Sequence, residues 1–137
     1  METADLSETT IRAIPARRVN LIAALWTVAV IAISLQPLRP SHSAKSLLHR
    51  PAHFLLFGLT AVILSLFFAA PPGRPDRAFP KALAFTILLG YFIELLQHLI
   101  YRNRMEWWDV RDDALSAVAA LALLALARFL FVRPRAL

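Results

Sequence analysis

The chain has 137 residues, of which 58% are hydrophobic and 18% are charged, a low proportion of charge for a soluble domain. It contains no cysteine, which excludes a disulfide framework, a thiol nucleophile and a thiolate metal site. The net charge of +6 does not indicate nucleic-acid binding, because the basic residues are scattered through every connection and not gathered on one face.

Four apolar segments of about 18 to 20 residues follow one another along the chain, at 19–36, 51–70, 82–101 and 114–131. A helix of this length crosses the roughly 30 Å hydrocarbon core of a bilayer. The sequence therefore predicts an all-α fold, a four-helix transmembrane bundle with short connections. The expected organisation is a cytoplasmic N-terminal tail, a four-span membrane domain and a C-terminal tail, at 1–18, 19–132 and 133–137.

The first apolar segment, 19–36, also has features of a signal peptide, since a basic leader with Arg17 and Arg18 precedes it. Its apolar region of about 18 residues is longer than the usual 7 to 15, and no Ala-x-Ala cleavage site follows closely. A retained helix is therefore favoured over a cleaved one.

Prolines mark the connections, with Pro51 expected to close the first and Pro80 the second. Of the 15 Lys and Arg residues, nine fall in the N-terminal tail, the second connection and the C-terminal end, and six in the first and third connections. By the positive-inside rule, both termini are expected in the cytoplasm of a multi-pass plasma-membrane protein.

Polar residues interrupt the end of the third segment and the start of the fourth, on the side expected to face away from the cytoplasm. Residues at helical spacing share a face: Glu94, Gln97, His98 and Tyr101; Asp109, Asp113, Ser116 and Ala120; and, opening the second segment, His49 and His53. Ionisable side chains are costly in lipid, so such a group marks a candidate functional site. We expect one cluster between the last three helices, formed by His53, Glu94, Gln97, Arg104 and Asp109.

Structural roles are an alternative for the same residues. Hydrogen bonds between helices would let His53, Glu94 and Gln97 hold the bundle together. Trp107 and Trp108 suit interfacial anchors, and the acidic residues that open the fourth helix suit its dipole. Elsewhere, small residues such as Gly58 and Ala120 are expected to set how closely the helices approach.

Three short motifs follow one another in order. The first is His53-Phe-Leu-Leu-Phe57-Gly58-Leu59, in which an aromatic residue lies four positions after a His that opens a helix. The second is Glu94-Leu-Leu-Gln97, near a helix end. The third is an Arg, a short loop and two acidic residues four apart, Arg104-Met-Glu106-Trp-Trp-Asp109-Val-Arg-Asp-Asp113-Ala-Leu-Ser116-Ala117. With these motifs, 53–120 resembles the VanZ-like family of small integral membrane proteins.

The resemblance implies a membrane protein whose founding family member is associated with resistance to the glycopeptide teicoplanin, and it implies no known reaction. The sequence departs from the family pattern at two places: Asp113 stands where the family usually has Asn, and Ser116-Ala117 stands where it usually has Gly. Arg102 and Asn103 compete with Arg104 as the match to the family's Arg. The ligand-binding residues that we expect are His53, Glu94, Gln97, Arg104, Asp109 and Asp113.

Three functions fit this pattern. The favoured one is binding, without catalysis, of a polar or anionic lipid-linked or cell-wall ligand, with Arg104 meeting an anionic group. The second is a membrane-embedded enzyme with Glu94 as general base and His53 as proton carrier. The third is a structural accessory subunit in the lipid bilayer, with oligomerisation left open. No cofactor is expected, and no metal, because no ligand motif has diagnostic spacing. Four short helices without an internal repeat disfavour a transporter.

Overall fold

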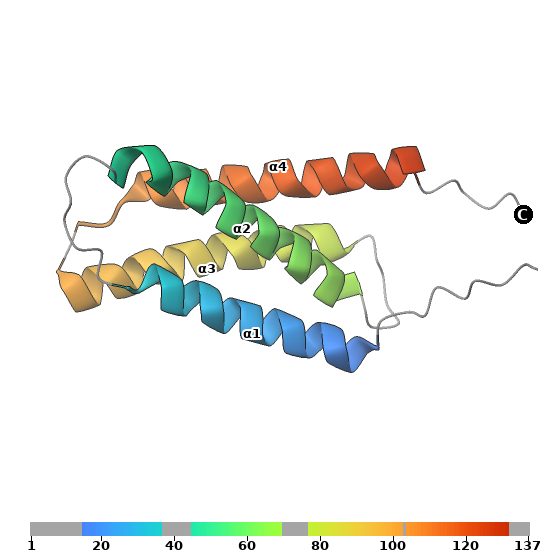
Figure 1. Ribbon diagram of the computed structural model, residues 1–137, viewed down its shortest axis with the longest axis horizontal. Coiled ribbons are helices and arrows are strands. Elements are labelled where there is room, and N and C mark those ends of the chain that lie inside the picture. The colour runs from blue at the N-terminus through green and yellow to red at the C-terminus, as the bar shows by residue number, and fades with distance from the viewer. Residues whose placement is uncertain (1–14, 37–44, 70–76, 103, 132–137) are drawn as a thin grey trace, which may run out of the picture.

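The computed structural model describes residues 15–36, 45–69, 77–102 and 104–131 (Figure 1). These form four helices and no strand, with α1 at Ala16–Ser34, α2 at Lys45–Ala69, α3 at Ala78–Tyr101 and α4 at Trp107–Phe131. All four contain a stretch long and apolar enough to cross a membrane. The predicted all-α four-helix bundle is confirmed, and the chain is a multi-pass membrane protein.

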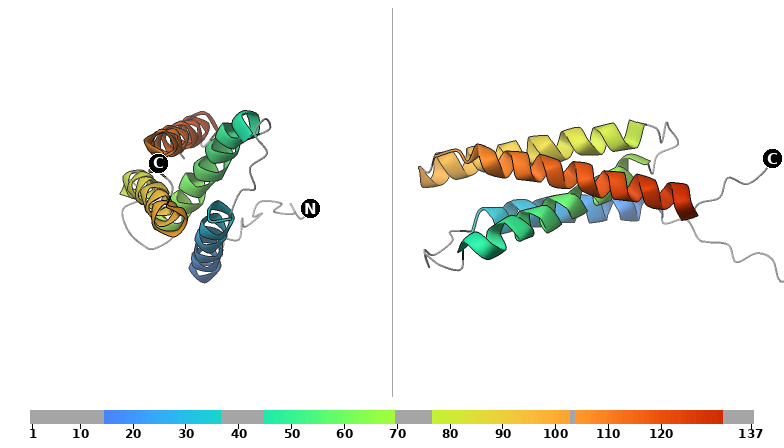
Figure 2. Two further views of the ribbon diagram at one scale, coloured as in Figure 1. Left: turned by 90° about the vertical axis from the view of Figure 1, so that its left-hand side faces the viewer. Right: turned by 90° about the horizontal axis from the view of Figure 1, so that it is seen from above.

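The central helix is α2, which crosses the bundle obliquely and packs against each of the other three (Figure 2). Its contact with α3 and α4 is built around three alanines with no exposed surface, Ala61, Ala82 and Ala117. Small residues let helix backbones approach closely in lipid, where van der Waals packing drives association. A second buried group, Val30, Phe57 and Ile93, joins α1 to α2 and α3.

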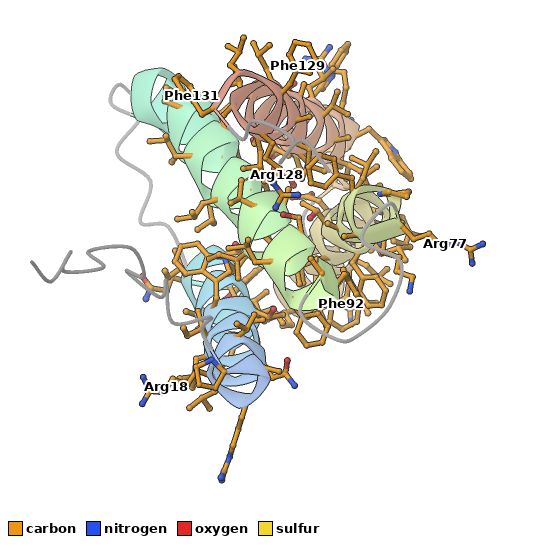
Figure 3. The ribbon with its side chains drawn as sticks, turned by 90° about the vertical axis from the view of Figure 1, so that its right-hand side faces the viewer. Arg18, Arg77, Phe92, Arg128, Phe129 and Phe131 are labelled. Carbon is orange, nitrogen blue, oxygen red and sulfur yellow. The ribbon has the colours of Figure 1, made fainter. Side chains whose placement is uncertain are left out.

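The outside of the bundle is apolar. Large hydrophobic side chains are widely exposed, with Phe129 and Phe131 on α4 at 82% and 83% (Figure 3). A soluble protein rarely leaves so much contiguous apolar surface in water. This surface is therefore the face that meets lipid.

Each helix begins before the apolar segment that predicted it. The expected boundary at Pro51 is wrong, because α2 begins at Lys45 and continues through the proline. Proline removes one backbone hydrogen bond, to the carbonyl four residues earlier. That carbonyl precedes the apolar stretch, which begins at Pro51, so water can satisfy it. Pro80 lies in the first turn of α3, where the backbone N–H has no helical partner.

The starts of α1 and α3 and the ends of α2 and α4 lie together at one end of the bundle (Figure 1), and the two ends differ in charge. One end, here called the basic end, carries Arg17, Arg18, Arg77, Lys81 and Arg128. The opposite end, here called the acidic end, carries every described acidic residue: Glu94, Glu106, Asp109, Asp112 and Asp113. The acidic end also holds Arg102, Arg104 and Arg111, so it is mixed in sign whereas the described residues of the basic end are not.

We expect the basic end to face the cytoplasm, since positive charge is retained there. Reporter enzymes fused at position 18, within 102–108 and after Leu137 test this orientation. A periplasm-type phosphatase should be active only at 102–108, and a cytoplasm-dependent fluorescent protein only at the other two positions. A C-terminal phosphatase fusion that is active, with a silent 102–108 fusion, would reverse the orientation.

Candidate functional site

A histidine–aspartate pair joins α2 to α4 at the acidic end. Nδ1 of His53 lies 2.8 Å from Oδ1 of Asp113, and their side chains are 17% and 2% exposed. The His53 ring also stacks on Phe57, with ring centroids 5.7 Å apart. The ring is thus held from two sides, and the carboxylate has the partner that a buried charge requires.

Two glycines make room for polar side chains between the helices. A Cβ atom on Gly90 would lie 2.7 Å from Oδ2 of Asp113, and one on Gly58 would lie 3.0 Å from Oγ of Ser116. The Ser116 hydroxyl donates to the backbone carbonyl of Phe54 on α2. Glycine is therefore what admits a carboxylate and a hydroxyl into these two helix contacts.

Glu94 is buried near the end of α3 and supports the start of α4. The residue is 4% exposed, and its Oε2 accepts a hydrogen bond from the backbone N–H of Glu106 at 3.1 Å. The Glu106 carbonyl in turn accepts the N–H of Asp109 at 2.9 Å, which forms the first turn of α4. Glu94 and Asp109 both act electrostatically on His53.

His53 on α2 thus lies within electrostatic range of three carboxylates, those of Glu94 on α3 and of Asp109 and Asp113 on α4, which makes four ionisable residues from three helices. We refer to them as the polar cluster. The sequence predicted His53, Glu94 and Asp109 in one group, and the structure brings them together. It pairs His53 directly with Asp113.

The loop that leads into α4 begins with an unusual backbone conformation. Arg102 has φ of 58°, in the left-handed region where most residues other than Gly and Asn are disfavoured. A residue in this conformation ends a helix sharply and reverses the chain. The reversal returns the chain to Glu94, which binds it at Glu106.

Gln97 and Tyr101 face α1 and not the polar cluster. Nε2 of Gln97 donates to the Ser34 carbonyl at 2.8 Å, and the Tyr101 hydroxyl donates to the Leu35 carbonyl. These carbonyls lie at the end of α1, where the last turn has no helical donors. Residues three apart on a helix point about 60° from one another, which is enough to direct Glu94 and Gln97 to different neighbours.

The acidic end carries three exposed arginines, of which Arg111 forms a described ion pair. Arg111 donates from Nη2 to Oδ1 of Asp112 at 2.7 Å, and its guanidinium lies 4.5 Å from the centre of the Trp108 ring. Arg104 is exposed on the loop before α4, and no ion pair joins it to the rest of the described chain. Its place in the cluster stays a prediction.

The remaining candidates have simpler placements. Trp107 and Trp108 are 61% and 65% exposed, as interfacial anchors would be. His98 is exposed, while His42 and the side chain of His49 lie outside the described residues. Among the described residues, no three His, Asp or Glu side chains are arranged to hold a metal ion.

One polar contact within the membrane was missed from the sequence. Nε1 of Trp26 on α1 donates to Oγ1 of Thr60 on α2 at 2.9 Å, and the Thr60 hydroxyl donates to the Leu56 carbonyl at 2.7 Å. A Trp within an apolar segment carries an N–H that needs an acceptor. That requirement could have predicted a hydrogen bond from Trp26, although it does not identify which hydroxyl accepts it.

No family model, curated protein or solved structure matches this chain.

Proposed function

We propose that this chain is a VanZ-like protein of the plasma membrane that binds a polar group of a cell-envelope ligand at the acidic end. The observation that carries the proposal is the burial of Glu94 and Asp113 beside the half-buried His53, from three helices, at one end of an apolar bundle. Ionisable residues within membrane spans are rare, and they mark ligand or ion sites when they face the bundle interior.

The charge of the polar cluster determines which chemical groups suit it. Three of its four members are carboxylic acids, and the fourth, His53, is already bonded to Asp113. Carboxylates accept hydrogen bonds from ammonium, hydroxyl and amide groups. The buried part of the site therefore suits a donor group, whereas an anionic group of the same ligand suits the exposed guanidinium of Arg104. A lipid-linked molecule that carries both an amine or hydroxyl and a phosphate has this chemistry.

The VanZ-like resemblance supports the cell envelope as the source of this ligand. Its three motifs contribute His53, Glu94, Asp109 and Asp113, which are the four members of the polar cluster. By the same resemblance, sensitivity to teicoplanin is the phenotype to measure first.

An acid–base enzyme is a second candidate, favoured by the 2.8 Å hydrogen bond between His53 and Asp113. A carboxylate on Nδ1 fixes both the orientation and the tautomer of an imidazole, as general acid–base catalysis requires. Here Asp113 would position His53, and His53 would carry the proton.

A purely structural role is the third candidate, since Glu94, Gln97 and Ser116 all bond to the backbone of another segment.

Mass spectrometry of the purified protein tests ligand binding. We expect a polar ligand to accompany the wild-type protein and to fall at least about tenfold in Glu94→Gln and Asp109→Asn, because a hydrogen bond to a charged group is worth about 1.5–3 kcal/mol. Glu106→Gln is the matched control. It also removes one negative charge, but from an exposed side chain, and it keeps the backbone N–H that Glu94 binds.

These replacements should change the free energy of unfolding little, because the cost of desolvating a carboxylate offsets most of the stabilisation that its hydrogen-bond partners provide. Membrane accumulation and thermal unfolding in detergent measure this. If Glu94→Gln leaves the ligand and teicoplanin sensitivity intact but removes the protein from the membrane, the cluster is structural. If His53→Gln abolishes the phenotype while the ligand stays bound, the enzyme is favoured.

A further inference from the structure

Glu94 on α3 reaches the start of α4 across the short connection between the two helices. α3 ends at Tyr101 and α4 begins at Trp107, and the carboxylate accepts a hydrogen bond from the backbone N–H of Glu106, the residue immediately before α4. A carboxylate is favourable at a helix N-terminus, because the first N–H groups lack helical acceptors and carry partial positive charge. The acceptor here comes from a different helix, so the contact also fixes where α4 starts relative to α3.

Two further features hold the same junction. Arg102 ends α3 with φ of 58° and ψ of 22°, and a residue other than glycine stays in this left-handed region only where its surroundings determine it. Next to Glu106, the Trp107 ring packs on Tyr91 of α3, with ring centroids 6.1 Å apart. Tyr91 precedes Glu94 by three residues, so the two lie toward one face of α3. A hydrogen bond and an aromatic contact thus attach the start of α4 to this face.

Arg104 lies within this junction and is carried by it. It is two residues before Glu106 along the chain, so the Cα atoms of the two residues are at most about 7 Å apart. The Glu106 N–H is in turn 3.1 Å from Oε2 of Glu94. The hydrogen bond at Glu106 therefore limits how far Arg104 can move from the Glu94 carboxylate.

The two carboxylate oxygens of Glu94 have different surroundings. Oε2 is bonded to Glu106, whereas Oε1 has no hydrogen-bond partner among the residues that the structure describes. No enclosed side-chain oxygen of those residues lacks a partner, so Oε1 is not completely enclosed. Since each carboxylate oxygen accepts hydrogen bonds independently, Oε1 can bind a donor group while Oε2 stays bonded to Glu106.

We propose that Glu94 is a positioning residue as well as a ligand contact. Oε2 holds the connection between α3 and α4 and so places Arg104, while Oε1 accepts a hydrogen bond from the ligand. The proposal rests on the proposed function, in which Glu94 meets the donor group of the ligand and Arg104 meets its anionic group. It adds that one side chain sets the spacing at which the two groups are recognised.

Limited trypsin digestion of the full chain in detergent tests the positioning role without any ligand. Trypsin cleaves after Arg104 only when the backbone there opens, so the cleavage rate reports the population of the opened connection. Glu94→Leu removes the acceptor and should speed cleavage at least about tenfold, the factor by which a hydrogen bond to a charged group favours the closed connection. Glu94→Gln keeps an acceptor oxygen, so it should change the rate by at most about threefold.

Glu106→Pro removes the donor in place of the acceptor and should speed cleavage to the same extent; it also serves if Glu94→Leu accumulates poorly. Glu106→Ala is its matched control, since both replacements remove the acidic side chain and only proline removes the N–H. The double variant Glu94→Leu/Glu106→Pro should be cleaved no faster than either single variant, because both changes remove the same hydrogen bond. Cleavage after Arg77, exposed at the opposite end of the bundle, should be equal in every variant.

A Glu106→Pro variant that is cleaved no faster than Glu106→Ala would overturn the positioning role. Additive effects in the double variant would overturn it too, as would cleavage after Arg77 that rises in step, since the whole bundle would then be opening. No ligand enters these measurements, so their failure leaves ligand binding by the polar cluster standing. Conversely, a wild-type protein that purifies with no ligand would contradict the proposed function and leave the positioning result intact.

Discussion

Gly58→Leu is expected to lower the free energy of unfolding of the bundle by about 1–3 kcal/mol, because the added side chain has no space between α2 and α4. A Cβ atom there would already lie 3.0 Å from Oγ of Ser116 and 3.4 Å from Cβ of Ala120. Ala120→Leu enlarges the other side of the same contact and should act in the same direction. Thermal unfolding in detergent and membrane accumulation measure both changes.

Ala122→Leu is the matched control, since Ala122 lies on the same helix but is exposed to lipid. It should leave unfolding unchanged. Equal destabilisation by Ala122→Leu and Ala120→Leu would mean that helix composition, and not the α2–α4 contact, determines the result.

Asp113→Leu is expected to destabilise the protein strongly, for two reasons that act at one position. It removes the acceptor from His53, and an unsatisfied buried polar group costs about 1–3 kcal/mol. It also places a branched side chain against Gly90, where Oδ2 of Asp113 already lies 2.7 Å from the position of a Cβ atom. Thermal unfolding in detergent measures the loss.

Asp113→Asn removes the charge alone, because Asn keeps the size of the side chain and an oxygen that accepts a hydrogen bond from His53. It therefore separates the effect of charge from the effects of size and of the lost acceptor. It should therefore retain most of the stability that Asp113→Leu loses. An Asn variant as unstable as the Leu variant would show that the carboxylate charge itself holds α2 and α4 together.

The fold could be predicted from the sequence because lipid imposes a single condition on each span. A segment must be apolar and long enough to satisfy its own backbone, and four segments met that condition. The helix ends could not be predicted so well. Pro51 is a strong boundary signal in general, but here the lost hydrogen bond falls outside the span, where it costs little.

The candidate site was predictable as a location and not as a set of partners. Helical spacing placed Glu94, Gln97 and the acidic residues of α4 toward one end of the bundle. It does not give the rotation of one helix against another, so it could not reveal that Gln97 binds α1 while Asp113 binds His53. The contact between Asp113 and His53 depends on Gly58 and Gly90, which set the approach of α4 to α2 and α3.

The hydrogen bonds from Gln97 and Tyr101 to the end of α1 also bear on how the chain is assembled during synthesis. The acceptors at Ser34 and Leu35 precede their donors by 63 and 66 residues. When α1 and α2 have entered the membrane, the final carbonyls of α1 must still rely on water or lipid headgroups. They acquire protein partners only after α3 has emerged. The first span is thus completed by the third, so the α1–α2 hairpin reaches its final geometry late, after most of the protein has been made.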